Sequence, residues 1–176
     1  VAPWTAQVAT LGAQLVASRQ QAIAVLAPAF AERAGELGLP DAALDYTGEP
    51  PTIETLEARL ERDLDRGVTG LGPHLDDVTI RSGDRELRTF GSQGEQRLAV
   101  LSLLLAEAEV IAAERGTPPL VLLDDVLSEL DADRRRILVE RIGRVGQAVV
   151  TATGADALPF EPAQLLEVTP GAVRVR

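Results

Sequence analysis

Two neighbouring acids, Asp124 and Asp125, directly follow the apolar run of residues 120–123. Such a short apolar run is typical of a buried strand, and ligands of open α/β sheets collect at the carboxyl ends of strands. Adjacent like charges at the edge of a core are costly unless a cation or hydrogen-bond donors offset them. We therefore expect Asp124 to bind Mg²⁺, and Asp125 to orient and deprotonate an attacking water. The alternative is that the two acids merely begin an ordinary loop.

A second candidate is the Ser-Gln-Gly-Glu-Gln-Arg segment of residues 92–97, which is expected to open a long helix. Ser92 and Glu95 have the spacing of a capping box, which is enough to explain those two residues. It does not explain Gly94, because glycine in a first turn costs about 1 kcal/mol relative to alanine unless something must approach the backbone closely. A helix N-terminus with free N–H groups, a hydroxyl and a glycine can seat a phosphate. Capping and phosphate binding can coexist at this helix start.

The order of the motifs carries more weight than any one of them. A Ser-x-Gly-x-Gln helix start is followed by a long helix, an apolar strand ending in Asp-Asp, the Ser-Glu-Leu-Asp segment of residues 128–131, and a strand ending in Thr-Ala-Thr at residues 151–153. Residues 128–131 alone could be an ordinary helix cap. Each piece arises easily by chance, but all of them seldom occur in this order.

The elements that must position these motifs are helical in the first third of the chain. A helix is predicted over residues 5–35, and Pro28 should bend or split it. A short strand could lie at residues 42–46, and a second helix capped by Thr52 is predicted over residues 53–66. Turn residues at 67–73 place a domain boundary there, so we expect a small helical arm at 1–70 and an α/β domain at 71–176.

The expected α/β domain has a parallel-rich sheet with flanking helices. Its predicted elements are a hairpin of residues 78–81 and 86–88, a helix over 92–115, a strand at 120–123, a helix over 131–145, a strand at 147–151, and a last hairpin around 169–171.

Composition narrows the class of protein. The 176 residues include no cysteine, so a disulfide framework is excluded and a cytoplasmic location is expected. No apolar run reaches the roughly 18 residues of a membrane span. The formal charge of −10 argues against a broad basic surface for nucleic acid. All 17 basic residues are arginines, and methionine is absent, so we expect Val1 not to be a native start and the chain to be part of a longer protein.

The order of the motifs and their residues resemble the C-terminal half of ABC-type ATPases of the SMC/RecF kind. Residues 92–97 resemble the signature motif, and residues 122–131 resemble the Walker B strand and D-loop. The resemblance implies a partial ABC-ATPase head in which Ser92, Gln93, Gly94 and Gln96 reach the ATP held by the partner of a homodimer. It also implies that Asp131 lies at the dimer interface and that Thr153 stands where many ABC ATPases have a switch histidine.

The resemblance implies DNA repair, recombination and replication, and a place in the SOS response, through ATP-dependent dimerisation, DNA binding at gaps and recombinase loading with RecO- and RecR-like partners. DNA binding is expected mostly outside this chain because of its charge. The missing lysine excludes a Walker A loop, so the chain alone should not hydrolyse ATP. The alternatives are another SMC-like head and a non-catalytic interaction module.

One segment resembles the RecF family and also departs from it. Residues 72–77 read Gly-Pro-His-Leu-Asp-Asp, and Leu75 replaces an arginine of the family pattern, which puts a basic contact there in doubt. His74 beside two acids invites a catalytic reading. A hydrogen-bonded structural histidine in a Gly-Pro turn is the expectation, and His74 is left out of the catalytic set.

Overall fold

The computed structural model describes residues 2–154, 158 and 160–176. The chain divides into two compact units, Val1–Thr117 and Pro118–Arg176. The boundary expected near residue 70 falls inside the first unit. The division into an arm and a head therefore stays a prediction about the longer protein.

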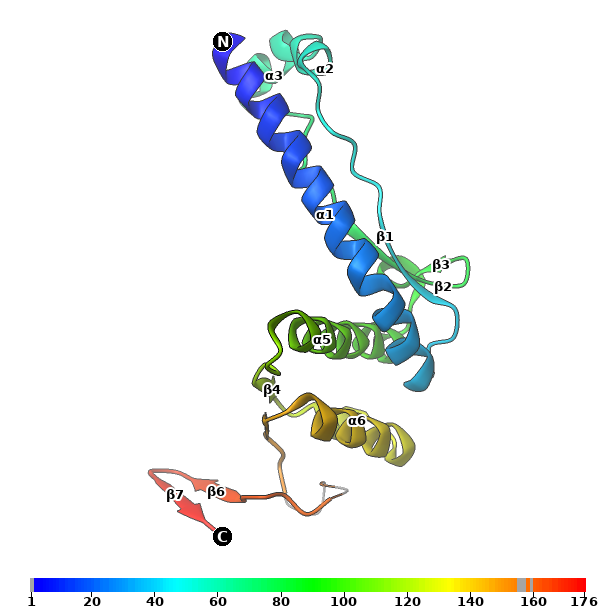
Figure 1. The fold of residues 1–176 in the computed structure, drawn as a ribbon, viewed down its shortest axis with the longest axis vertical. Coiled ribbons are helices and arrows are strands. Elements are labelled where there is room, and N and C mark those ends of the chain that lie inside the picture. The colour runs from blue at the N-terminus through cyan, green and yellow to red at the C-terminus, as the bar shows by residue number, and fades with distance from the viewer. Residues whose placement is uncertain (1, 155–157, 159) are drawn as a thin grey trace. The chain divides into compact units, whose positions relative to one another are not determined.

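The first unit is built on one long helix, α1 (Ala2–Glu36), which Pro28 does not split. Phe30 and Ala34, beyond the proline, are fully buried. Here α1 packs against strand β1 (Ala42–Tyr46) and helix α5 (Gln93–Arg115), as Figure 1 shows. Of the two outcomes expected at Pro28, a bend or a split, the split does not occur, because this packing outweighs the one backbone hydrogen bond that a proline removes.

Helix α1 carries two apolar stripes. One is buried and includes Ala9, Val16, Phe30 and Ala34. The other stays exposed although it repeats at alternating steps of four and three residues, the spacing of a coiled-coil seam. Its members include Trp4, Val8, Leu11, Leu15 and Val25, and between 43% and 72% of each is exposed.

Beyond β1 the chain forms two short helices where one was expected. Thr52 caps α2 (Ile53–Glu57) through a capping box with Thr55, as its hydroxyl predicted. The predicted single helix is interrupted before α3 (Leu60–Arg66), because the amide of Arg59 donates to the carbonyl of Leu56, three residues back, and tightens the turn.

A three-stranded antiparallel sheet follows, in the order β1-β2-β3. The possible strand at residues 42–46 is confirmed, and β1 pairs along its length with β2 (Val78–Ser82). The third strand, β3 (Arg85–Glu86), is shorter than expected because the next residues form a single helical turn, α4 (Leu87–Phe90). This turn leads directly into α5.

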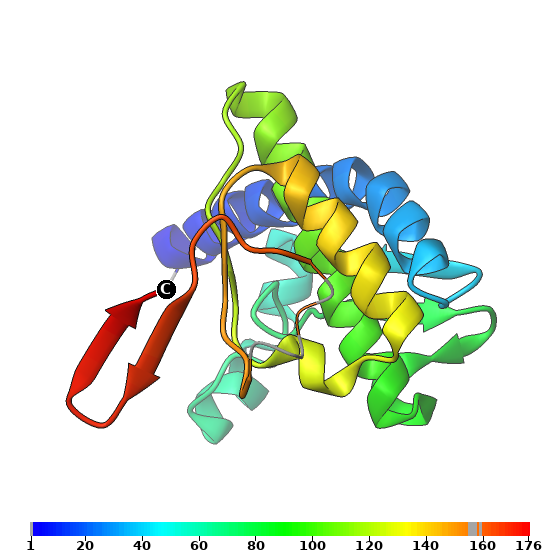
Figure 2. The same cartoon turned by 90° about the horizontal axis from the view of Figure 1, so that it is seen from below.

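The second unit contains a parallel β-α-β arrangement, which confirms the α/β prediction. Strand β4 (Val121–Leu123) pairs in parallel with β5 (Ala148–Val150), and helix α6 (Ala132–Val145) connects them after a 3-10 turn, η1 (Val126–Glu129). In Figure 2 these strands run side by side next to α6.

The described chain ends in an antiparallel hairpin of β6 (Leu166–Thr169) and β7 (Ala172–Val175), which was also predicted. The hairpin extends away from β4, β5 and α6 (Figures 1 and 2). One of its faces gathers four exposed apolar side chains, Leu166, Val168, Val173 and Val175.

The sheet of β4 and β5 is also only half covered. Val121 and Leu123 are buried, whereas Leu122 is 66% exposed and Val149 is 49% exposed. Parallel strands are normally buried on both faces. Within the described residues, no helix has the length and apolar composition needed to cross a lipid bilayer.

Candidate functional site

The predicted signature segment forms the first turn of α5. Ser92 is the N-cap, and its hydroxyl accepts a hydrogen bond from the amide of Glu95 at 3.2 Å. The carboxylate of Glu95 accepts in return from the amide of Ser92 at 2.7 Å and pairs with Arg85 at 2.9 Å. These contacts, led by the hydrogen bond from the Ser92 amide, lower the pKa of Glu95 to about 2.

Gln93 and Gly94 occupy the first two positions of this helix and are exposed. Within the described residues, their backbone N–H groups donate no hydrogen bond, as expected at the start of a helix. A methyl group added to Gly94 would meet nothing closer than the hydroxyl of Ser92 at 4.0 Å. The packing of the described chain therefore gives no reason for a glycine here.

The side chain of Gln96 also makes contacts within the chain. Its side-chain amide donates to the carbonyls of Leu87 at 3.0 Å, Arg88 at 3.3 Å and Gly91 at 3.3 Å. These carbonyls belong to α4 and the residue that follows it. The side chain of Gln96 thus fixes the turn before the signature helix.

In the second unit, Asp124 and Asp125 lie at the carboxyl end of β4, as predicted. Thr151, just past the end of the parallel strand β5, contacts both of them: its hydroxyl donates to Oδ1 of Asp124 at 2.5 Å and accepts from the amide of Asp125 at 2.9 Å. Thr151 was not among the predicted site residues. The available signal was a hydroxyl residue ending the next predicted strand of a parallel-rich sheet.

Asp125 adopts a left-handed backbone conformation, with φ of 48°. This region is uncommon for residues other than glycine, although aspartate and asparagine enter it more readily than most. The hydroxyl of Ser128 donates to the carbonyl of Asp125 at 2.9 Å, which holds the turn from its other side. The candidate base is thus presented by a tightly hydrogen-bonded turn.

Asp131 and Thr153, the other two predicted site residues of this unit, make no described contact with Asp124 or Asp125. Asp131 caps α6, where its carboxylate accepts from the amide of Arg134 at 2.9 Å and pairs with the guanidinium of that residue at 3.1 Å. Thr153 is exposed two residues beyond Thr151. Within the described residues, the hydroxyl that reaches Asp124 is therefore that of Thr151.

Residues 72–77 are held by side chains from several elements of the first unit. Arg19 of α1 donates to the carbonyl of Pro73, and the hydroxyl of Tyr46 donates to Asp76 at 2.7 Å. Asp77 pairs with Arg88 of α4. A methyl group at Gly48 would overlap both Tyr46 and Asp76, so this contact requires a glycine there.

His74 has the structural role expected of it. Its Nε2 lies 2.9 Å from the carbonyl oxygen of Thr69, and because a carbonyl can only accept, Nε2 carries the proton. Leu75 is 61% exposed.

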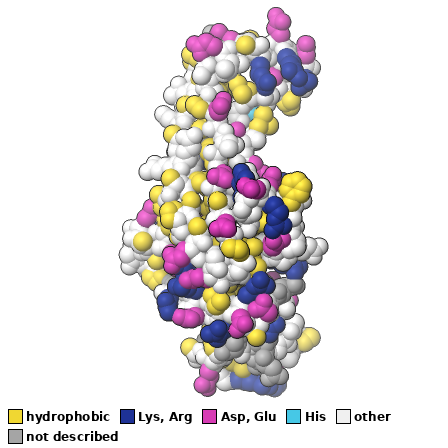
Figure 3. All heavy atoms as spheres, turned by 90° about the vertical axis from the view of Figure 1, so that its right-hand side faces the viewer, with side chains coloured by type: hydrophobic (Ala, Val, Ile, Leu, Met, Phe, Trp, Pro, Cys, Tyr) yellow, Lys and Arg dark blue, Asp and Glu magenta, His cyan; other side chains and the backbone are white. Residues whose placement is uncertain are grey.

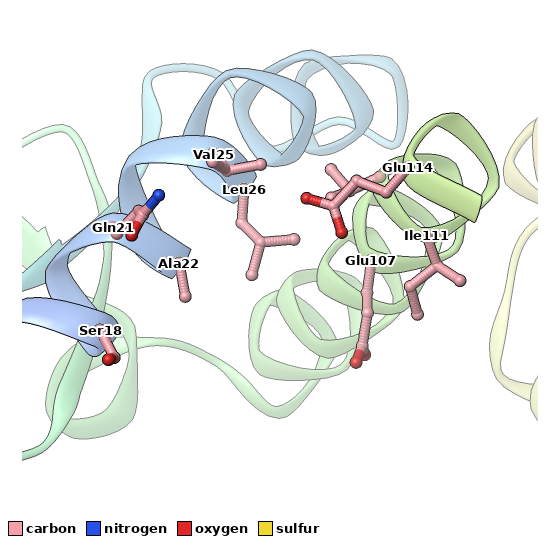
Figure 4. A pocket seen from close by; sticks show the side chains of 9 residues that line it. Ser18, Gln21, Ala22, Val25, Leu26, Glu107, Ile111 and Glu114 are labelled. Carbon is pink, nitrogen blue, oxygen red and sulfur yellow. The ribbon is translucent and has the colours of Figure 1, made fainter. Parts of the chain in front are cut away.

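A groove of about 350 Å³ lies between α1 and α5 (Figure 4). Its walls combine apolar side chains such as Val25, Leu26 and Ile111 with the acids Glu107 and Glu114. Glu107 lies 14 residues beyond Gln93, about 21 Å along a helix. The groove is therefore separate from the start of α5, and its acids do not suit a phosphate.

Charged side chains of both signs are interspersed on the face shown in Figure 3. Several arginines are paired with nearby acids, as in Arg136 with Asp133 and Arg144 with Glu140. Together with the net charge of −10, this offers no basis for a strong phosphate-binding surface on the face shown.

No protein-family model matches the chain. Individual proteins are similar to the chain in sequence. A protein of Anaeromyxobacter dehalogenans described as DNA replication and repair protein RecF is 42% identical over 170 residues, a match that covers 86% of this chain and 45% of that protein. A protein of Desulfitobacterium hafniense with the same description is 35% identical, covering 97% of this chain and 50% of its own length. The chain matches the C-terminal half of RecF.

Solved structures agree with the sequence match. The structure described as the recombination mediator protein RecF-ATP in the RecFOR pathway superposes with a TM-score of 0.80 at 25% identity, covering 98% of this chain and 49% of that one. An Smc head bound to the winged-helix domain of ScpA superposes with a TM-score of 0.54 at 14% identity, which shows a shared fold alone. The chain spans about half the length of the RecF proteins that it matches.

Proposed function

We propose that this chain supplies the signature helix, the Walker B acids and the D-loop of a RecF-type ATPase acting in DNA repair and recombination. The position of Asp124 at the carboxyl end of a parallel strand, with a hydroxyl holding its carboxylate, carries the proposal. RecF relatives that match most of the chain support it, as do solved RecF structures that contain ATP or an ATP analogue.

Mg²⁺ fits the acids of this site. It keeps several waters and is usually held by one or two carboxylates together with phosphate oxygens of the substrate. Asp124 offers an exposed carboxylate, and no cluster of three or more acidic, histidine or cysteine side chains occurs within the described residues. Asp124 would bind the cation that neutralises charge on the phosphates, and Asp125 would orient the attacking water.

The start of α5 suits the second role, contact with a phosphate. Two backbone amides that no hydrogen bond occupies within the described residues, the hydroxyl of Ser92 and a glycine whose Cβ position is open create a site for an anion at the positive end of a 23-residue helix. In our proposal Ser92, Gln93 and Gly94 contact ATP held by the other protomer of a homodimer. Gln96 acts on this contact through the turn it holds, and Asp131 and Thr153 remain candidates for the interface and the switch position.

The rest of the ATPase must come from outside this chain. No lysine is present for a Walker A loop, and the apolar faces of β4–β5, of the β6–β7 hairpin and of α1 are exposed. We propose that the other half of the longer protein covers part of these surfaces and supplies the Walker A loop. DNA binding, recombinase loading and RecO- or RecR-like partners belong to that whole protein, in line with the RecFOR pathway named for its structural neighbours.

Sedimentation of the full-length protein with and without ATP and Mg²⁺ tests the proposal. The wild type should dimerise with ATP, and Asp124→Asn and Ser92→Arg should remain monomeric while keeping their folded circular dichroism spectrum. Glu114→Gln, an exposed acid at the far end of α5, serves as the matched control and should dimerise. Unchanged dimerisation in both site variants would favour a non-catalytic interaction module.

A further inference from the structure

The hydroxyl of Thr151 makes two hydrogen bonds to the acids that follow β4. It lies between the two consecutive residues that follow the other strand, donating to Asp124 and accepting from the amide of Asp125. The backbone amide of Thr151 also donates to the carbonyl of Leu123 at 2.9 Å. Three hydrogen bonds thus connect one residue at the end of β5 with three successive residues at the end of β4.

The direction of the two hydroxyl bonds follows from their partners. The amide of Asp125 can only donate, so the hydroxyl oxygen accepts from it. The hydroxyl proton is then directed to Oδ1 of Asp124, which as a carboxylate can only accept. A side chain here must both accept and donate, which valine, of nearly the same shape, cannot do.

This arrangement restrains a carboxylate that is otherwise exposed. An exposed aspartate samples several rotamers, and ordering it for a cation costs side-chain entropy. The bond from Thr151 engages Oδ1, and no hydrogen bond occupies Oδ2 within the described part of the chain. Mg²⁺ demands near-ideal octahedral geometry, so a carboxylate that presents one fixed oxygen suits it.

The same hydroxyl stabilises the left-handed conformation of Asp125. Such a backbone costs free energy and persists where surrounding contacts fix it. Thr151 binds the amide of Asp125 and Ser128 binds its carbonyl, so both ends of this residue are held. One side chain therefore controls the orientation of the cation ligand and of the candidate base.

We infer that Thr151 is a positioning residue that orients Asp124 toward the nucleotide-bound divalent cation and keeps Asp125 in its turn. This inference rests on the proposed function, because it assigns Asp124 to the cation. In this inference Thr151 acts through Asp124 and Asp125 and not through contact of its own with the cation or the nucleotide. Outer-shell partners of metal ligands typically change metal affinity by about 10- to 100-fold when removed.

The experiment compares Thr151→Val with Thr151→Ser in the full-length protein, using Mn²⁺ and a non-hydrolysable ATP analogue. Electron paramagnetic resonance reports the Mn²⁺ affinity in the presence of the analogue. A fluorescent ATP analogue without metal reports nucleotide affinity separately. The valine variant should bind Mn²⁺ about 10-fold more weakly with unchanged metal-free nucleotide affinity, and the serine variant should stay within about threefold of the wild type.

A matched control is Thr169→Val, which removes an exposed threonine hydroxyl at the end of β6 and should leave Mn²⁺ affinity unchanged. Equal Mn²⁺ affinities for the valine variant and the wild type would overturn the inference while leaving the proposed function standing. A wild-type protein that binds no Mn²⁺ with the analogue would overturn both. If Thr151→Val does not fold, serine and alanine at position 151 differ by one hydroxyl, and equal affinities in that pair would likewise overturn it.

Discussion

The guanidinium of Arg85 lies 2.9 Å from the carboxylate of Glu95, so strand β3 is tied to the first turn of α5. The same carboxylate accepts the amide hydrogen of Ser92 at 2.7 Å. The helix start that carries the signature segment is therefore fixed by its own capping box and by a side chain from the preceding sheet. Its orientation thus depends in part on Arg85 and Glu95, which are not among the proposed nucleotide contacts.

The low pKa of Glu95 gives the stability of this helix start a defined pH dependence. Because the folded state lowers the pKa from 4.5 to about 2, the stabilisation is complete above pH 4.5 and declines as the pH falls toward 2. We expect Glu95→Gln to lower the melting temperature at pH 7, and this difference from the wild type to close between pH 4.5 and 2. Thermal denaturation followed by circular dichroism measures it. A difference that stays constant down to pH 2.5 would contradict the prediction.

Gln96 and Gln93 offer a matched pair of identical substitutions in one helical turn. Gln96→Glu replaces a donor that faces three carbonyls with an acceptor, so it should destabilise the fold by about 1–3 kcal/mol. Gln93→Glu places a negative charge at the first position of α5 and should stabilise it by about 0.3–1 kcal/mol. Urea denaturation of both variants tests this. The prediction fails if the two changes have the same sign.

Gly48 should tolerate no side chain. Alanine there would overlap Tyr46 and Asp76, whose hydrogen bond holds residues 72–77, and we expect a loss of about 1–3 kcal/mol. Gly35→Ala is the control, since a methyl group there meets nothing within 4 Å and replaces a glycine within α1. That variant should gain about 0.5–1 kcal/mol. Comparable stabilities of the two variants in denaturant titrations would refute this explanation of Gly48.

A substitution of Gly94 should weaken ATP-dependent dimerisation without lowering the stability of the fold. Gly94→Leu places a good helix former in open space, so the melting temperature of the protein should stay the same or rise. The added side chain would block close approach to the amides of the first turn. We therefore expect the ATP-dependent dimer of the full-length protein to weaken at least 10-fold in sedimentation equilibrium. Normal dimerisation of this variant would remove the reason for assigning phosphate contact to this turn.

Local signals in the sequence predicted the elements whose ends are set by their own residues. Ser92 with Glu95, and Thr52 at the start of α2, cap helices as their spacing indicates. Where distant residues decide, prediction was wrong. Helix α1 continues through Pro28 because buried residues beyond it hold the helix in place. Residues 87 and 88 were expected in a strand but belong to helix α4, where the side chain of Gln96 binds their carbonyls.

The candidate site shows the same limit. Motif order placed Asp124 and Asp125 at a strand end, since that requires only the pattern of one strand. Thr151 was missed because its importance depends on the parallel register of β5 with β4, which no local pattern contains. The contact of Gln96 with the nucleotide stays a prediction from its motif, and the structure adds hydrogen bonds from its side chain to the preceding turn that the motif did not predict.

If the rest of the longer protein covers the exposed stripe of α1, as we propose, this helix takes part in two cores. A chain produced without the rest of its protein would leave the stripe of Leu11 and Leu15 in water, where it can self-associate. The exposed stripe would then distinguish the incomplete protein from the complete one. Until its second stripe is covered, the protein would present to chaperones and proteases the apolar surface by which they recognise an unfinished fold.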